Sequence, residues 1–217
     1  MRNIKKVIEE HITRNIRTYF ILIIIFLLGL IIGLIVVNNS SEEQETEITN
    51  YINTFITELK NGSKLDYFKL LKSSFGNNLF LVIILWFMSL AVIGIPAVYG
   101  MVGYKGFCMG YTISSVVMTL GTGKGIAFVL SSMLIHNIIL IPCMLAVAVS
   151  GINLYKSIMK DRRKENIKLE IIRHTVFCLI MLAIMAIGSL IETYISSNLL
   201  VGVVSYLWYK NLIVNYL

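Results

Sequence analysis

The sequence predicts an all-α membrane protein, a polytopic helix bundle of about five transmembrane helices with additional amphipathic interfacial helices. The first observation is composition: 57% of the 217 residues are hydrophobic and 14% are charged, whereas soluble domains are about half apolar and about a quarter charged. The second is that the apolar residues gather in runs of about 20, the length that crosses a bilayer as a helix. The third is that basic clusters flank these runs, and such clusters set membrane topology.

The chain begins with a basic amphipathic segment, residues 1–18, which precedes the first apolar run, residues 19–37. Basic residues beside a span stay in the cytoplasm, so we expect the amino terminus inside. Gly29 and Gly33 lie one turn apart on one face of this first span. Such pairs let two helix backbones approach closely. We interpret them as helix-packing positions, which could also serve a homo-oligomer.

Residues 38–78 form the only sizeable polar segment, and acidic residues outnumber basic ones in it. We therefore predict an extracytoplasmic loop of amphipathic helices. Its acidic start and its apolar repeat form the expected surface for a protein partner, namely Glu42, Glu43, Glu45, Glu47, Tyr51, Phe55 and Leu59. In the alternative interpretation, the apolar residues rest on lipid or on the protein's own spans.

Residues 79–149 contain enough apolar sequence for three spans, and the middle one, residues 103–120, is rich in glycine. We expect Pro96 to kink the first of the three, because proline lacks a backbone donor. Lys105 is expected at the inner end of the middle span, where its side chain can reach the interface. Five small residues lie on one side of this predicted helix, within about 80° of arc around its axis. They are Gly103, Gly106, Gly110, Ser114 and Gly121, the last of which directly follows the helix. This stripe predicts close packing against another helix.

Polar residues lie near the middle of the next apolar run, residues 126–149. They are His136 and Asn137, followed by Pro142, which frees a backbone carbonyl one turn earlier. Polar groups at such depth are costly and mark functional positions in membrane proteins. Two interpretations stay open: a hydrogen bond that fixes helix packing, or a polar site in a small membrane permease or transporter subunit.

Seven basic residues gather in residues 150–174, which we predict to be a cytoplasmic loop. The fifth span is residues 175–195. Five full crossings keep both basic clusters inside and place the carboxyl terminus outside. The last segment, residues 196–217, has an apolar stretch too short to cross, with Tyr and Trp that favour the interface. It is expected to be an extracytoplasmic interfacial tail.

The sequence contains no pattern that indicates catalysis. The first four predicted spans hold no Asp or Glu, so they offer no carboxylate pair for acid–base chemistry. Cys108, Cys143 and Cys178 are far apart and have no metal-binding or disulfide spacing. The chain has no HExxH motif and no phosphate-binding loop. We expect no enzyme activity, no cofactor and no metal, and no nucleic-acid partner, because the basic clusters flank spans and suit membrane lipid.

Three stretches resemble a known family. They are GYKGFCMGYT at residues 103–112, GTGKG at residues 121–125, and LIHNIILIP at residues 134–142. Together with the order of elements along the chain, they resemble the stage II sporulation protein M family of endospore-forming bacteria. The resemblance covers nearly the whole chain.

The resemblance implies a non-catalytic, multi-pass protein of the mother-cell septal and engulfing membrane. Members of that family form a complex with two extracytoplasmic peptidoglycan hydrolases, of the amidase and lytic transglycosylase types, during engulfment. The chain is therefore expected to be a scaffold that recruits and holds these hydrolases, with the permease as the alternative.

Overall fold

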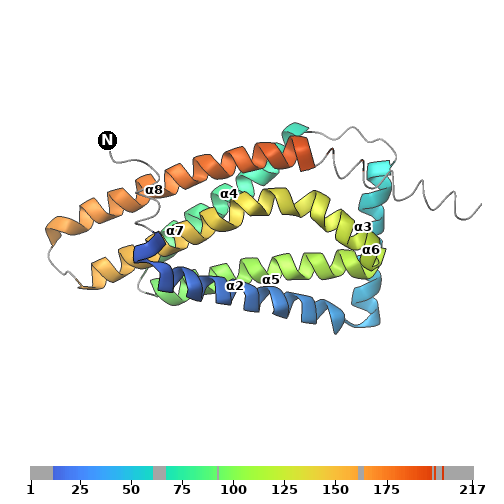
Figure 1. The fold of residues 1–217 in the computed structure, drawn as a ribbon, viewed down its shortest axis with the longest axis horizontal. Coiled ribbons are helices and arrows are strands. Elements are labelled where there is room, and N and C mark those ends of the chain that lie inside the picture. The colour runs from blue at the N-terminus through green and yellow to red at the C-terminus, as the bar shows by residue number, and fades with distance from the viewer. Residues whose placement is uncertain are drawn as a thin grey trace, which may run out of the picture.

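The computed structural model describes residues 12–60, 67–91, 93–160, 164–196, 198 and 202. The long helices are α2 (Ile16–Asn38), α3 (Glu42–Lys60), α4 (Tyr67–Leu90), α5 (Gly94–Leu120), α7 (Ile135–Lys160) and α8 (Lys164–Ile191). Shorter elements are α6 (Thr122–Val129) and two π-helical segments, η1 (Leu130–Leu134) and η2 (Glu192–Ser196). No strand occurs among the described residues, which confirms the predicted all-α class (Figure 1).

Four stretches of the described chain are long and apolar enough to cross a membrane: α2, α4, His136–Met159 within α7, and Ile167–Ile195 over α8 and η2. The fifth long helix, α5, has 27 residues and runs beside α2 through the bundle (Figure 1). α5 contains five glycines, and eight of its residues are buried. It thus packs closely among its neighbours.

The core lies where α2, α4, α5, α7 and α8 meet. Its fully buried side chains include Leu22, Leu85, Val98, Met144 and Met185. The outward face of α2 is apolar as well, and Phe20, Leu28 and Ile32 are more than half exposed there. An apolar surface on both sides of a helix is typical of a membrane span, because lipid covers the outer side.

The reversal between α4 and α5 differs from the sequence prediction. The predicted span at residues 79–102 with a kink at Pro96 is replaced by two helices, one ending at Leu90 and one beginning at Gly94. Pro96 explains the break, because its ring would clash with the carbonyl four residues earlier, whereas the first turn of a helix tolerates proline. Gly94 fits the tight reversal, since a Cβ there would lie 2.6 Å from Tyr155 Cδ2.

The segment predicted as an extracytoplasmic loop, residues 38–78, is divided differently in the structure. Its first part is α3, but α4 already begins at Tyr67. The second amphipathic helix of the prediction is therefore the first part of a membrane-crossing helix, because α4 runs without a break from Tyr67 to Leu90. Of the expected terminal segments, residues 1–11 and most of residues 196–217 lie outside the described residues.

Gly121 has a different role from the predicted one. It is the turn between α5 and α6, with a φ of 79° that favours glycine. A Cβ at Gly121 would meet nothing within 4 Å, so this residue contributes a turn and not a packing surface. The close contact of this hairpin is made by Gly125, where a Cβ would lie 2.6 Å from Val117 Cα.

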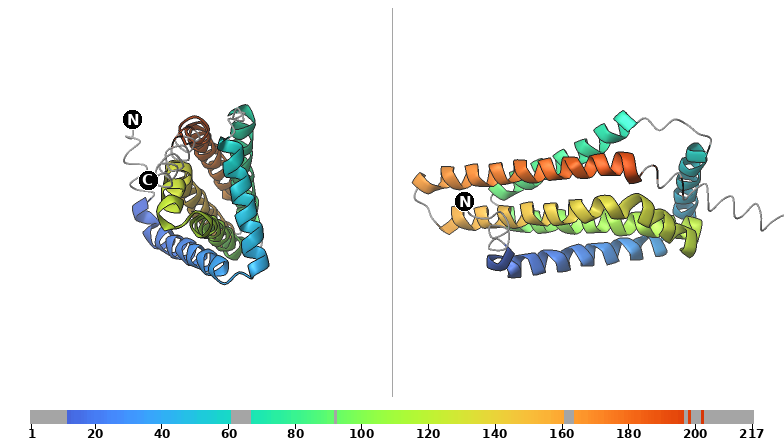
Figure 2. Two further views of the ribbon diagram at one scale, coloured as in Figure 1. Left: turned by 90° about the vertical axis from the view of Figure 1, so that its right-hand side faces the viewer. Right: turned by 45° about the horizontal axis from the view of Figure 1, so that its top comes forward.

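α3 lies across one end of the bundle, at a steep angle to the long helices (Figure 2). We call this end the α3 end. Ile52 and Ile56 are buried in a small cluster with Val116 of α5 and Phe128 of α6. The apolar stripe of α3 thus rests on the protein's own helices, as one of the two sequence interpretations holds. Its acidic residues Glu42, Glu43, Glu45 and Glu47 are exposed.

Candidate functional site

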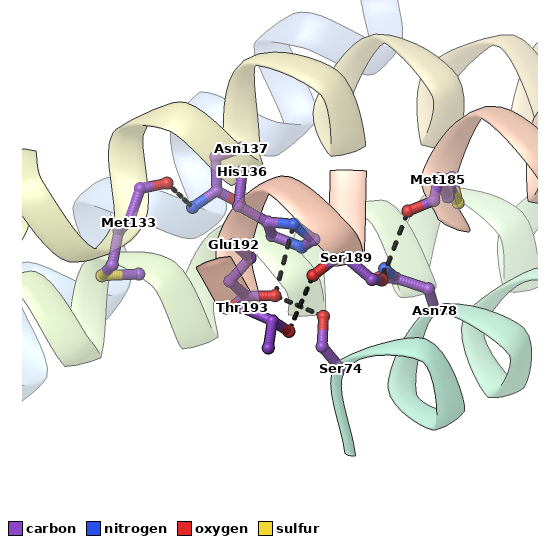
Figure 3. A network of polar contacts seen from close by, with 9 residues as sticks. All are labelled: Ser74, Asn78, Met133, His136, Asn137, Met185, Ser189, Glu192 and Thr193. Atoms are coloured by element: carbon purple, nitrogen blue, oxygen red, sulfur yellow. Dashed lines mark hydrogen bonds and ion pairs between the residues drawn. The ribbon is translucent and has the colours of Figure 1, made fainter. Parts of the chain in front are cut away.

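A cluster of polar side chains joins α4, α7 and α8 near the α3 end (Figure 3). Nδ1 of His136 on α7 lies 3.4 Å from Oε2 of Glu192 on η2. The hydroxyl of Ser74 on α4 donates a hydrogen bond to the same carboxylate oxygen. The side chain of His136 is 13% exposed and that of Glu192 is 35% exposed. One carboxylate therefore links three helices that are distant in sequence.

The cluster continues toward the bundle interior through hydrogen bonds between neutral groups. Nδ2 of Asn78 donates to Oγ of Ser189 at 2.9 Å, and Ser189 donates to the carbonyl of Met185 at 3.3 Å. Thr193 donates to the carbonyl of Ser189 at 2.8 Å. Asn78, Ser189 and Thr193 are all buried. The Asn78–Ser189 bond joins α4 to α8, and interhelical hydrogen bonds contribute about 0.6 kcal/mol on average in membrane proteins.

Both π-helical segments lie at this cluster. η1 ends two residues before His136, and η2 begins at Glu192 itself. The two segments are also in contact with each other. A π turn holds an extra residue, and such turns occur frequently at functional sites in helices. The change of winding rotates the side chains that follow, and here it accompanies the approach of His136 to Glu192.

The depth of His136 and Asn137 differs from the sequence expectation. They were expected near mid-span, but His136 lies opposite Glu192, near the end of the Ile167–Ile195 stretch. Asn137 donates to the carbonyl of Met133 at 2.8 Å, within its own helix. Pro142 is exposed on the surface of α7. Of the three predicted residues, His136 alone thus reaches across to another helix in the contacts described above.

The glycine stripe of α5 packs against the glycine pair of α2. A Cβ at Gly29 would lie 2.1 Å from the carbonyl oxygen of Gly103, and a Cβ at Gly106 would lie 2.2 Å from that of Phe26. A Cβ at Gly33 would likewise lie 2.2 Å from the carbonyl oxygen of Phe107. These backbones touch, so no larger residue fits at these positions without displacement of a helix.

The same interface continues toward the α3 end. A Cβ at Gly110 would lie 2.0 Å from the carbonyl oxygen of Leu30. One turn further on, the hydroxyl of Ser114 donates to Oδ1 of Asn38 at 3.3 Å. The stripe thus joins two helices of one chain that run in the same direction. A homo-oligomer would have to use another face of α2, since α5 occupies this one.

Lys105 does not lie at a helix end, as the sequence predicted. Because α5 begins at Gly94, Lys105 stands roughly 16 Å along the helix from its first residue and roughly 22 Å from its last. It is half-buried there. The anchor prediction depended on a span beginning at residue 103, and the earlier start of α5 moves the lysine toward mid-bundle.

The predicted partner surface divides into two parts in the structure. Glu42, Glu43, Glu45 and Glu47 are exposed, and Tyr51 is 78% exposed. Phe55 is 42% exposed and makes an edge-to-face contact with Phe128, with ring centroids 6.5 Å apart. Leu59 belongs to α3, but its side chain lies outside the described residues. The acidic residues and Tyr51 are thus available to a partner, whereas Phe55 helps to hold α3 in place.

A second polar cluster, which sequence reasoning missed, lies at the end opposite α3. Oγ of Ser150 is 2.9 Å from Nδ1 of His174, and Asn153 donates to Oδ1 of Asn15 at 3.0 Å. A cavity of about 310 Å³ opens beside them, and Arg14 is part of its wall.

Sequence reasoning also missed the roles of Ser74, Asn78 and Ser189. The available signal was the i, i+4 spacing of Ser74 and Asn78 in an apolar helix.

The described residues contain no group of three or more His, Cys, Asp or Glu side chains that could hold a metal ion. The polar clusters consist of side chains that bond to other helices or to their own backbone. Fold and site together define a polytopic α-helical membrane protein whose polar side chains join its spans.

Comparison with known proteins narrows this class. The family model for stage II sporulation protein M matches residues 22–197. The chain therefore belongs to the stage II sporulation protein M family, which confirms the resemblance seen in the sequence, and it is a sporulation membrane protein. No curated protein and no solved structure matches the chain significantly.

Proposed function

We propose that this protein is a non-catalytic membrane scaffold that recruits and holds peptidoglycan hydrolases at the septal and engulfing membrane during endospore formation. The partners would be extracytoplasmic hydrolases of the amidase and lytic transglycosylase types. Membership of a sporulation family supports the setting. The identity of the partners, the septal location and the non-catalytic role are what the proposal adds to that setting.

The observation that carries this proposal is the outward face of α3. Four carboxylates, Glu42, Glu43, Glu45 and Glu47, lie within six residues, and Tyr51 projects from the same helix. α3 is held on its other side by buried Ile52 and Ile56. An anchored helix with a free acidic and aromatic face is suited to bind a protein, because tyrosine is enriched in interface cores. Complementary charge speeds and orients such binding.

The distribution of charge supports the orientation that this role requires. The start of α2, the end of α7 and the start of α8 meet at the end opposite α3 (Figure 1). These segments and the residues just before α2 carry Arg14, Arg17, Lys156, Lys168 and Arg173, whereas Lys69, Lys72 and Lys124 belong to segments toward the α3 end. Basic residues beside spans remain in the cytoplasm. The α3 end would then face the extracytoplasmic space, where the hydrolases act, with the amino terminus inside and the carboxyl terminus outside.

Co-purification tests the proposal. The full-length protein is purified from sporulating cells in a non-denaturing detergent, and bound hydrolases are measured by quantitative mass spectrometry. Reversal of Glu42, Glu43, Glu45 and Glu47 to lysine should abolish hydrolase recovery, while Thr54→Ala, an exposed change on the same helix, should leave it unchanged. Equal recovery with both variants would count against a role for α3.

One observation favours a second candidate, a small permease or transporter subunit. The His136–Glu192 pair places two ionisable groups at the junction of two π-helical segments. Intramembrane pairs of this kind occur along proton and solute pathways. Purified protein in vesicles would then move a solute or lipid, and His136→Ala with Asn137→Ala would abolish the movement without loss of folded protein.

A further inference from the structure

A cavity of about 450 Å³ lies between α3 and the neighbouring parts of α5 and α6. Most of its wall is apolar or aromatic, including Ile48, Phe55, Tyr111 and Phe128. Ligand sites in proteins are usually cavities of about 300–1,000 Å³ with apolar walls and a few polar groups. By size and lining, this cavity suits an apolar chain attached to a small polar group.

One polar group in this wall is the buried hydroxyl of Ser115. The residue is 5% exposed, and its Oγ is buried without a hydrogen-bond partner. Nearby hydroxyls on α5 are engaged: Thr112 donates to the carbonyl of Cys108, and Thr119 donates to that of Ser115. A buried hydroxyl without a partner is unfavourable. A ligand carbonyl in the cavity would satisfy it.

The position of α3 indicates the environment of the cavity. α3 is amphipathic and crosses the end of a membrane bundle (Figure 2). Such a helix lies at the boundary between lipid headgroups and acyl chains. The cavity beneath it is therefore at the depth where the ester carbonyls of a phospholipid meet its acyl chains.

A second cavity, of about 480 Å³, lies between α5 and α2, closer to mid-bundle along α5. Phe107 lines this deeper cavity and Tyr111 lines the outer one, and their ring centroids are 6.1 Å apart. Tyr104, also in the deeper wall, stands roughly 16 Å along the helix from Ser115. Half of a bilayer's hydrocarbon core is about 15 Å. An acyl chain that passes from the outer cavity over Tyr111 and Phe107 would therefore reach the deeper one within the depth of one leaflet.

Charge at the opening distinguishes between headgroups. Glu47 is part of the cavity wall, and Glu42, Glu43 and Glu45 precede it on the same helix. These carboxylates repel a headgroup whose only charge is a phosphate, as in phosphatidylglycerol or cardiolipin. They attract an ammonium group within the screening distance of about 8 Å.

We propose that the cavity beneath α3 binds one phospholipid with an ethanolamine headgroup. An acyl chain lies along α5, the hydroxyl of Ser115 donates to an ester carbonyl, and the ammonium group pairs with Glu47. This inference goes beyond hydrolase recruitment and does not depend on it. Its structural consequence is that lipid fills the space between α3 and the spans, so that α3 is held at a fixed height above the bundle.

Native mass spectrometry of the purified full-length protein tests the proposal. The protein is exchanged into detergent that contains equal amounts of phosphatidylethanolamine and phosphatidylglycerol with identical acyl chains, and each retained lipid is counted. We expect one phosphatidylethanolamine per chain, in clear excess over phosphatidylglycerol. Retention of neither lipid, or preference for phosphatidylglycerol, would overturn the proposal.

Three matched pairs of variants separate the parts of the site. Thr112→Phe, an exposed position in the cavity wall, should block retention, whereas Ile126→Phe, an exposed position on α6 outside it, should not. Glu47→Gln should remove the preference for ethanolamine while Glu43→Gln keeps it. Ser115→Ala should reduce retention of both lipids, whereas Thr119→Ala, whose hydroxyl is engaged, should not.

The same variants show whether a protein segment occupies the cavity instead. If Thr112→Phe reduces hydrolase co-purification but leaves lipid retention unchanged, the occupant is a partner protein and the lipid assignment is wrong. Equal lipid retention by Thr112→Phe and Ile126→Phe would likewise place the lipid elsewhere on the bundle. Thermal unfolding of each variant in detergent identifies any variant that fails to fold. If a wall variant does not fold, Glu47→Gln still tests the headgroup preference, because this exposed change is not expected to affect folding.

Discussion

Nδ1 of His136 lies 3.4 Å from Oε2 of Glu192, and this contact joins α7 to the π-helical end of α8. Ser74 donates to the same carboxylate oxygen, so α4 is tied to the pair as well. Three helices are thus fixed relative to one another toward the end of the bundle that α3 crosses (Figure 1). α3 itself rests on α5 and α6.

The first prediction concerns this pair. His136→Ala and Glu192→Gln should each destabilise the protein in detergent, because each removes one side of a partly buried contact. The double variant should lose less unfolding free energy than the two single variants lose together. The difference, the coupling free energy, should be about 0.6 kcal/mol, as for interhelical polar contacts generally. A double-mutant cycle of unfolding measures it, with exposed Glu43→Gln as control. Strictly additive losses would show that the two side chains do not interact.

The second prediction concerns the packing of α2 against α5. Gly110→Ala should destabilise the protein by about 1–3 kcal/mol or more, because its Cβ would lie 2.0 Å from the carbonyl oxygen of Leu30. Gly76→Ala is the matched control: nothing lies within 4 Å of its Cβ, and alanine favours a helix. Unfolding in detergent distinguishes them. If both variants are as stable as the parent protein, the two backbones are further apart than described.

The third prediction separates the two parts of α3. Phe55→Asp should detach α3, because it places a charge against Phe128. Tyr51→Ala should leave α3 in place, since this side chain is 78% exposed. Hydrogen exchange of α3 in the purified protein measures the difference. Faster exchange is expected for Phe55→Asp alone, and unchanged exchange in that variant would argue against the contact with Phe128.

The fourth prediction concerns orientation. In a variant without the native cysteines, Tyr51→Cys should react with a membrane-impermeant maleimide in intact protoplasts, and Lys156→Cys should react only after lysis. Both side chains are exposed, so accessibility in the folded protein does not limit either reaction. The reverse pattern would invert the proposed topology and place α3 in the cytoplasm.

The all-α bundle could be predicted because it depends on local sequence. Runs of apolar residues, the amphipathic pattern of α3 and the small residues of α5 are each visible within one segment. The glycine stripe also indicated that another helix would pack there. It could not identify that helix, because the choice between α2 of the same chain and a second copy depends on tertiary arrangement.

The candidate site was less predictable for the same reason. His136 was visible as a polar residue in an apolar run, but Glu192 and Ser74 lie in segments whose proximity only the folded bundle creates. The depth of His136 in the membrane was also misjudged, because its partner Glu192 lies near the end of the Ile167–Ile195 stretch. The early start of α5 at Gly94 had a similar effect on Lys105.

The most direct test of the central claim is the position of the hydrolases in sporulating cells. The amidase-type and transglycosylase-type partners and this protein carry different fluorescent labels, and Glu42, Glu43, Glu45 and Glu47 are reversed to lysine. We predict that the variant protein stays in the membrane while the hydrolases disperse from the septum. Hydrolases that remain at the septum beside the variant would contradict a scaffold that acts through α3.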